Sequence, residues 1–188
     1  MSRSFNPNES ARSLRQARRI IVVGSPGAGK TNLARRIATL TRLPLFSLDD
    51  LYWERSWTRP TTSTFNLRHG ELLRAASGII DGNYFNWLAA RVSWSDTILF
   101  LDVPTLTALA GVLCRSAVRK WGYSGDLPER VRIHGNCAQE PLDLAFLRFV
   151  LRFRTDMRPR MLELFNEAIS KVAVEVGARG PRITTCGD

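Results

Sequence analysis

One eight-residue segment constrains this chain more than any other: residues 24–31 have the sequence GSPGAGKT. The segment matches the glycine-rich pattern that binds phosphate groups in nucleotide-binding proteins. It follows the β-branched run Ile20 to Val23 and precedes residues 31–40, whose apolar side chains have helical spacing. A strand, a glycine loop and a helix are the context that this pattern needs, so the segment predicts a phosphate-binding site.

Each part of this loop has a physical role. Glycines let the backbone curl until successive N–H groups point at phosphate oxygens, and the positive end of the following helix adds to the attraction. A compact Lys30 ammonium can reach the β- and γ-phosphates, and the Thr31 hydroxyl is a ligand for Mg²⁺. We therefore expect ATP and Mg²⁺ to bind here. The predicted nucleotide-binding residues are Gly24, Ser25, Pro26, Gly27, Ala28, Gly29, Lys30 and Thr31.

Short apolar runs alternate with helical stretches along the rest of the chain. Buried strands are predicted at residues 20–23, 45–48, 78–81, 97–101 and 172–176, and a polar tail after the last of them. Helical stretches are predicted over residues 51–76, 87–91, 106–120 and 142–170, with a break at Pro159. Five strands separated by helices predict a doubly wound α/β sheet, whose ligand belongs at the carboxyl ends of the strands.

The composition, with 44% hydrophobic and 23% charged residues among 188, is typical of a single globular domain. Residues 1–17 lack an apolar period and predict a flexible basic leader before a domain at 18–188. No apolar run approaches the roughly 20 residues of a bilayer crossing, and we find no secretion signal, so we expect a cytoplasmic protein without a membrane partner. Three cysteines and two histidines predict neither a disulfide framework nor a zinc site.

The chain carries a net charge of +10, which attracts polyanions such as nucleotides, phosphorylated substrates or nucleic acid. Arginines in the leader and over residues 148–158 would form the contact surface for nucleic acid. No helix-turn-helix or zinc-finger pattern supports sequence-specific binding. A nucleic-acid-associated protein is therefore the alternative to an enzyme.

Carboxylates follow three of the predicted strands. A phosphate loop needs one of them to hold Mg²⁺ with Thr31, and the turn sequence behind Asp81 favours Asp81 over Asp102. On the acceptor side, Asp49 is predicted to accept the proton of the acceptor hydroxyl. The alternative is that Asp50 caps the next helix and Asp49 is a solvated turn residue.

Two arginines and several aromatic residues complete the candidate site. Arg115 and Arg119 lie one helical turn apart, where they could stabilise charge on the transferring phosphoryl group or could simply be solvated. Tyr52 and Trp53 are expected either to pack or to stack on a substrate ring. The Gly-rich segment at about 121–141 is expected to be a mobile lid.

Several segments, taken together, resemble one family. They are the phosphate loop, Leu48 to Trp53 (LDDLYW), Ile80 to Tyr84 (IDGNY) with Arg91, Asp96 to Pro104 (DTILFLDVP), and Cys137 to Pro159. In this order they resemble the topology modulation proteins, a group of adenylate-kinase-like P-loop proteins, over residues 18–176.

This resemblance implies a three-layer P-loop NTPase fold with a five-stranded parallel sheet flanked by helices. It further implies a helical substrate insert at about 50–76 and a lid at about 121–141. The implied activity transfers the γ-phosphoryl group of ATP, with Mg²⁺, to a nucleotide or another small acceptor. It supports Asp81 as the magnesium carboxylate and places Arg115 at the transferring phosphoryl group.

The sequence departs from true adenylate kinases at two places. Gly111 stands where those kinases carry an adenine-stacking Arg, and IDGNY lacks the Pro-Arg that contacts the AMP phosphate. Neither base preference nor AMP as a substrate is therefore implied. The candidate substrate-binding residues are Asp49, Tyr52, Trp53, Asn83, Tyr84 and Arg91, and the candidate catalytic residues are Lys30, Asp49, Arg115 and Arg119.

Overall fold

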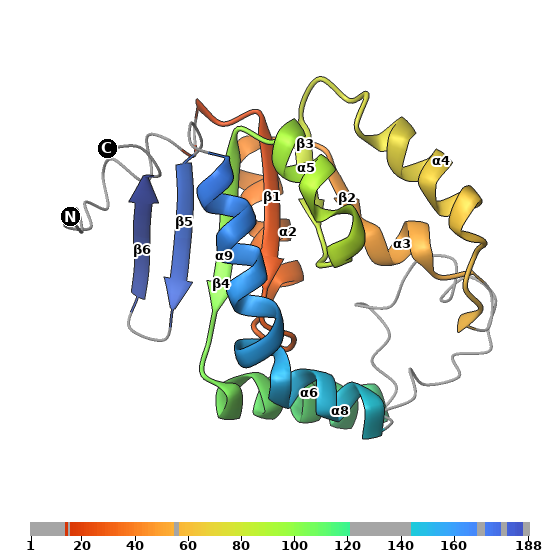
Figure 1. Cartoon of the computed structure of the whole chain (residues 1–188), viewed down its shortest axis with the longest axis vertical. Coiled ribbons are helices and arrows are strands. Elements are labelled where there is room, and N and C mark those ends of the chain that lie inside the picture. The colour runs from red at the N-terminus through yellow and green to blue at the C-terminus, as the bar shows by residue number, and fades with distance from the viewer. Residues whose placement is uncertain are drawn as a thin grey trace.

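A single sheet with helices on both faces forms the frame of the molecule (Figure 1). The computed structural model describes residue 14 and residues 16–54, 57–120, 144–168, 172–177 and 180–185; the predicted lid and nearly all of the predicted leader lie outside them. The strands described are β1 (Arg19–Gly24), β2 (Leu45–Ser47), β3 (Gly78–Asp81), β4 (Thr97–Asp102), β5 (Val172–Gly177) and β6 (Gly180–Thr185). The helices described are α2 (Lys30–Thr41), α3 (Leu48–Tyr52), α4 (Thr62–Leu72), the 3-10 turn η2 (Phe85–Trp87), α5 (Leu88–Trp94), α6 (Thr105–Lys120), α8 (Leu144–Arg152), the π-helical turn η3 (Phe153–Met157) and α9 (Arg158–Glu167).

The strand order in the sheet is β2-β3-β1-β4-β5-β6. Neighbouring strands from β2 to β5 pair in parallel, and β6 pairs antiparallel to β5. The predicted α/β class, with parallel strands flanked by helices, is therefore confirmed. The predicted count of five strands is wrong, because the expected polar tail contains β6. Its β-branched residues 183–185 suit a strand, and it returns along β5 as a hairpin.

Strand β1 lies at the centre of two apolar cores, one on each face of the sheet. Ile21 and Val23 point into a core that α5 and α9 cover, whereas Ile20 and Val22 point into a core that α2 covers. All four side chains are fully buried. Burial on both faces explains why the strand is an unbroken apolar run rather than an alternating one.

The helical stretch expected over residues 51–76 is two helices, α3 and α4, which lie at the β2 side of the sheet (Figure 1). Pro60 disfavours a helical conformation at the residue before it. Thr61 then caps α4, since its side chain accepts a hydrogen bond from the Thr64 N–H at 3.2 Å. Likewise the helical stretch at 142–170 is interrupted at η3, and Pro159 lies in the first turn of α9, where a proline is tolerated.

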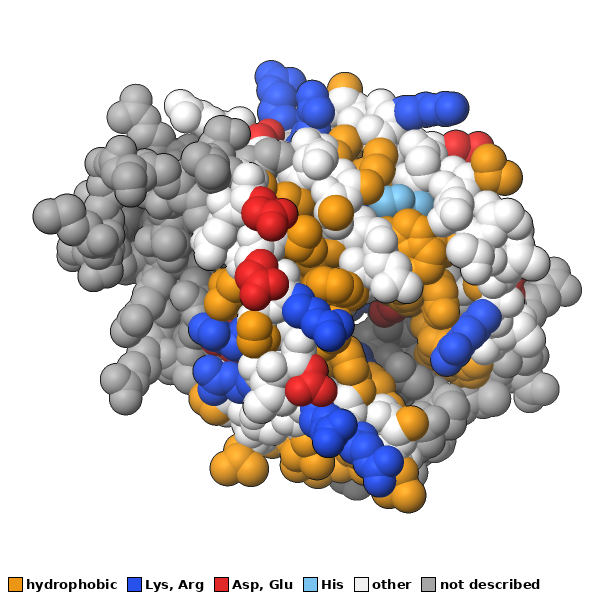
Figure 2. Space-filling view, in the orientation of Figure 1, with side chains coloured by type: hydrophobic (Ala, Val, Ile, Leu, Met, Phe, Trp, Pro, Cys, Tyr) orange, Lys and Arg blue, Asp and Glu red, His pale blue; other side chains and the backbone are white. Residues whose placement is uncertain are grey.

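Hydrophobic side chains gather over α6 and α8, at the lower edge of the molecule in Figure 2. The exposed ones are Leu106, Leu113, Val118, Leu144, Phe149 and Leu151. The same two helices also pack against each other through Ala108, Val112 and Val150. None of the helices described has the length and apolar character to cross a membrane.

Candidate active site at the carboxyl ends of the strands

The glycine loop joins the end of β1 to the start of α2, as the sequence predicts. Gly27 and Gly29 have φ angles of 73° and 83°, in the left-handed region that favours glycine. The Ser25 N–H donates to the Leu101 carbonyl at 2.8 Å, which ties the loop to β4. A Cβ atom on Gly24 would lie 2.2 Å from the same carbonyl oxygen, so no larger residue fits there. The loop is therefore held in its curled form by neighbouring strands.

Lys30, the first residue of α2, folds back over this loop. Its Nζ donates to the Ser25 carbonyl at 2.8 Å and to the Gly24 carbonyl at 3.1 Å. Desolvation lowers the pKa of Lys30 to about 8, although the carboxylates of Asp81 and Asp49 oppose that shift. The ammonium is thus held by two backbone carbonyls of the loop, within electrostatic reach of two acids.

Thr31 and Asp81 meet directly, as the metal-site hypothesis requires. The Thr31 hydroxyl donates to Asp81 Oδ2 at 2.6 Å, and Asp81 is only 5% exposed. The parallel register of β3 with β1 pairs Asp81 with Val22, which brings the carboxylate beside the loop. Burial raises the pKa of Asp81, and the Thr31 hydrogen bond and the Lys30 charge act in the opposite direction. Within the described part of the chain, Asp81 Oδ1 is buried without a hydrogen-bond partner.

Asp102, the competing carboxylate, is paired with arginines instead. Arg158 Nε donates to Asp102 Oδ2 at 2.7 Å, and Arg154 Nη2 lies 3.5 Å from the same oxygen. Two arginines of the predicted 148–158 surface are therefore turned toward the end of β4. This pairing favours Asp81 over Asp102 as the acid that faces the loop.

Arg91 holds the turn after β3. The side chain is fully buried, and its guanidinium donates to the carbonyls of Gly82 at 2.5 Å, Tyr84 at 3.0 Å and Asn83. Burial lowers the pKa of Arg91 to about 9. With its N–H groups on three successive carbonyls, Arg91 fits a positioning role better than the predicted contact with substrate.

Asn83 also uses its side chain on the protein. Its Nδ2 donates to the Gly24 carbonyl at 2.9 Å, and its Oδ1 accepts from the Gly24 N–H at 3.0 Å. Asn83 was expected to contact the substrate. Instead, both polar atoms of its side chain form hydrogen bonds with Gly24, at the start of the glycine loop. The sequence offered one signal for this role, the glycine-asparagine turn directly after Asp81.

Asp49 lies in the first turn of α3, and the Tyr84 hydroxyl donates to its Oδ1 at 2.7 Å. Ring contacts extend from this pair: Tyr84 lies 4.6 Å from Tyr52 between ring centroids, and Tyr52 lies 5.1 Å from Trp53. Four of the six predicted substrate-binding residues, Asp49, Tyr52, Trp53 and Tyr84, are therefore contiguous. The Asp49 charge acts on Lys30, so this group lies within electrostatic reach of the phosphate loop.

Arg115, a residue of α6, lies near Lys30. Its charge contributes to lowering the pKa of Lys30, so the two cations lie near each other. Gly111, one turn earlier, packs on the loop itself, where a Cβ atom would lie 2.2 Å from the Gly27 carbonyl oxygen. This close approach explains why no arginine occupies position 111. The backbone of Arg119 continues α6, and its side chain lies outside the described residues.

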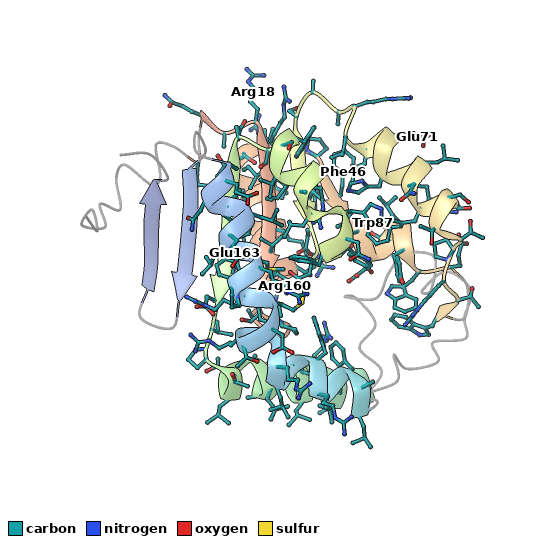
Figure 3. The ribbon with its side chains drawn as sticks, in the orientation of Figure 1. Arg18, Phe46, Glu71, Trp87, Arg160 and Glu163 are labelled. Carbon is teal, nitrogen blue, oxygen red and sulfur yellow. The ribbon has the colours of Figure 1, made fainter. Side chains whose placement is uncertain are left out.

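The structure also contains a groove of about 360 Å³. It is lined by η2 and α5 on one side and by α9 on the other, including Arg160 and Glu163 (Figure 3). None of the predicted site residues lines it. Across the described residues, no group of three or more His, Cys, Asp or Glu side chains could hold a metal ion. A magnesium site would therefore need phosphate oxygens as well as Thr31 and Asp81.

Neither a scan of protein-family models nor a search of curated proteins found a match to this chain.

Proposed function

We propose that this protein is an adenylate-kinase-like P-loop phosphotransferase of the topology modulation type. It binds ATP with Mg²⁺ at residues 24–31 and transfers the γ-phosphoryl group to a small acceptor. The observation that carries the proposal is the 2.6 Å hydrogen bond from Thr31 to the buried Asp81, at the end of a glycine loop that also holds Lys30. In this proposal α3 and α4 are the substrate insert; the lid expected at about 121–141 lies outside the described residues.

The residues present fit a magnesium ion. Hydroxyl and carboxylate oxygens are the ligands that Mg²⁺ prefers, and Asp81 Oδ1 has no hydrogen-bond partner among the described residues. Thr31 and Asp81 would hold the ion, directly or through water. When bound, Mg²⁺ supplies positive charge that stabilises the phosphate oxygens during transfer.

Three side chains of the protein would have the remaining roles in phosphoryl transfer. Lys30 would bind the β- and γ-phosphate oxygens, and Arg115 would add positive charge beside them. Asp49 would accept the proton of the acceptor hydroxyl. The acceptor oxygen then forms a bond to the γ-phosphorus, the bond from that phosphorus to the β–γ bridging oxygen breaks, and ADP leaves.

The alternative, a nucleic-acid-associated ATP-binding protein, has less support. Its predicted arginine surface at 148–158 includes Arg154 and Arg158, which both contact Asp102. The Asp102 carboxylate partly neutralises the positive charge of these two guanidinium groups. Nucleic-acid binding stays a prediction, which would be recognised by a steep salt dependence.

Isothermal titration with ATP, with and without Mg²⁺, tests the proposal. We expect Lys30→Ala to abolish ATP binding. Thr31→Val should abolish the increase in ATP affinity that Mg²⁺ causes in the wild type. Thr39→Val is the matched control, because Thr39 lies on the same helix and its hydroxyl donates to the Arg35 carbonyl at 3.0 Å. Equal ATP affinity in the wild type and in Lys30→Ala would refute the proposal.

A further inference from the structure

The turn that follows β3, residues 82–84, includes a strained residue. Tyr84 has a φ angle of 33°, in the left-handed region that residues with a Cβ atom seldom adopt. A residue in this region keeps its conformation only where the surrounding structure holds it there. The conformation of the turn therefore depends on contacts from outside the turn.

Arg91, a residue of α5, makes such contacts. Its guanidinium donates hydrogen bonds to the carbonyls of Gly82 at 2.5 Å, of Tyr84 at 3.0 Å and of Asn83, and the side chain is fully buried. The guanidinium carries five N–H donors in a fixed plane, so one arginine can hold three successive carbonyls. A lysine ammonium, a compact charge on a flexible stem, does not match this arrangement.

Asn83 connects the turn to the glycine loop. Its Nδ2 donates to the Gly24 carbonyl at 2.9 Å, and its Oδ1 accepts from the Gly24 N–H at 3.0 Å. The Lys30 ammonium donates to the same Gly24 carbonyl at 3.1 Å. The backbone position of Asn83, which Arg91 holds, is therefore linked to the residues that would bind phosphate.

Tyr84 connects the turn to α3. Its hydroxyl donates to Asp49 Oδ1 at 2.7 Å. The turn also packs directly on the start of this helix, because a Cβ atom on Gly82 would lie 2.9 Å from the Cβ atom of Leu48. A shift of the turn would therefore change the acceptor side of the candidate site as well as the loop side.

We propose that Arg91 is a positioning residue that links the two halves of the candidate site. It holds residues 82–84 in the conformation that brings Asn83 to the phosphate loop and Tyr84 to Asp49, and it contacts neither nucleotide nor acceptor. The inference rests on the proposed phosphotransferase function, which assigns the loop to MgATP. A positioning role differs from a purely structural one because the effect of Arg91 on MgATP binding passes through Asn83.

A double-mutant cycle on MgATP affinity tests this link. Arg91→Lys should lower the affinity by about tenfold, measured by titration calorimetry. In an Asn83→Ala protein the same substitution should lower it by less than about threefold, because the connection to the loop has already been removed. Equal losses in the two backgrounds, or no loss in either, would overturn the inference.

Val92→Ala is the control for loss of stability. It removes buried apolar packing from the same helix and leaves the guanidinium in place. MgATP affinity should stay within about threefold of the wild type, and a loss as large as that of Arg91→Lys would show that any destabilised α5 has this effect. If Arg91→Lys does not fold, Arg91→Gln takes its place in the cycle, since it keeps two N–H donors without the charge.

An NMR measurement tests the Tyr84 side and needs no nucleotide. With tyrosine isotope-labelled at Cζ, the signal of Tyr84 is identified by its absence in Tyr84→Phe, and it reports the hydrogen bond of the hydroxyl. Arg91→Lys should move this signal, as Asp49→Asn does, and Arg74→Lys, at an exposed arginine, should not. An unchanged signal in Arg91→Lys would refute the link to α3. If the wild type does not bind MgATP, the phosphotransferase proposal fails, and the Tyr84 signal still decides whether Arg91 holds the turn.

Discussion

Both polar atoms of the Asn83 amide bind the main chain of one residue, Gly24, through hydrogen bonds of 2.9 and 3.0 Å. The Lys30 ammonium donates to the same Gly24 carbonyl at 3.1 Å. Asn83 follows Asp81 by two residues, and the Arg91 guanidinium donates a hydrogen bond to the Asn83 carbonyl. The phosphate loop and the turn after β3 are thus one hydrogen-bonded unit, which fixes the candidate metal carboxylate relative to the candidate phosphate cradle.

Asn83→Ala should weaken this unit measurably. Removing two hydrogen bonds should lower the free energy of unfolding by about 1–3 kcal/mol, since a net hydrogen bond contributes about 0.5–1.5 kcal/mol. We also expect weaker MgATP binding, because Gly24, at the start of the loop, loses the two hydrogen bonds from Asn83 that hold it in position. Urea unfolding and calorimetric titration measure the two effects. Asn86→Ala, at an exposed asparagine three residues on, is the control and should change neither.

Gly111→Ala should disturb the glycine loop where α6 packs against it, at Gly27. Its Cβ would lie 2.2 Å from the Gly27 carbonyl oxygen, so α6 must move away from the loop. We expect a loss of about 1–3 kcal/mol in the free energy of unfolding, the usual cost of overpacking, together with weaker ATP binding.

Gly70→Ala is the matched control for this substitution. Gly70 lies in α4, and a Cβ there would meet no atom within 4 Å. Alanine should therefore stabilise the protein by about 0.5–1 kcal/mol through helix propensity. Similar stability changes for both glycine variants would show that the contact between α6 and the loop is not tight.

The sequence predicted the elements whose signals are local. The β-branched run at Ile20, the glycine loop and the strand ending at Asp81 lie where they were expected, because each combines a short apolar run with turn residues. Strand β6 was missed, since its identity depends on pairing with β5 and its composition is polar. The contacts of Asn83 and Arg91 could not be predicted either. Sequence spacing does not show that an asparagine will meet a loop 59 residues away, or that an arginine will be buried under three carbonyls.

His69 should make stability dependent on pH. The side chain is 3% exposed and stacks on Phe65, and burial, with a smaller contribution from the Arg91 charge, lowers its pKa from 6.5 to about 4. The unfolded chain then binds a proton below about pH 6.5 that the folded chain does not bind until about pH 4. Stability should therefore fall as the pH drops through this window, by on the order of 3 kcal/mol from this group.

Urea unfolding of His69→Gln between pH 4 and pH 8 measures this contribution. The variant is expected to lose less stability on acidification than the wild type, even if it is less stable at pH 8. Parallel curves for the wild type and His69→Gln would show that the buried imidazole does not carry the effect.

ATP affinity should depend on pH through Lys30. Its pKa lies at about 8 in the folded protein, below the ordinary 10.5, because burial disfavours the ammonium. As the pH rises through about 8, Lys30 loses its proton and with it the charge that attracts the phosphate oxygens, so MgATP affinity should fall by up to about tenfold per pH unit. Free of nucleotide, the protein should instead gain stability between pH 8 and 10.5, since the unfolded chain binds that proton more tightly. Titration calorimetry from pH 7 to pH 9.5 measures the affinity. An affinity that stays constant across this range would show that the charge of Lys30 does not contribute to binding.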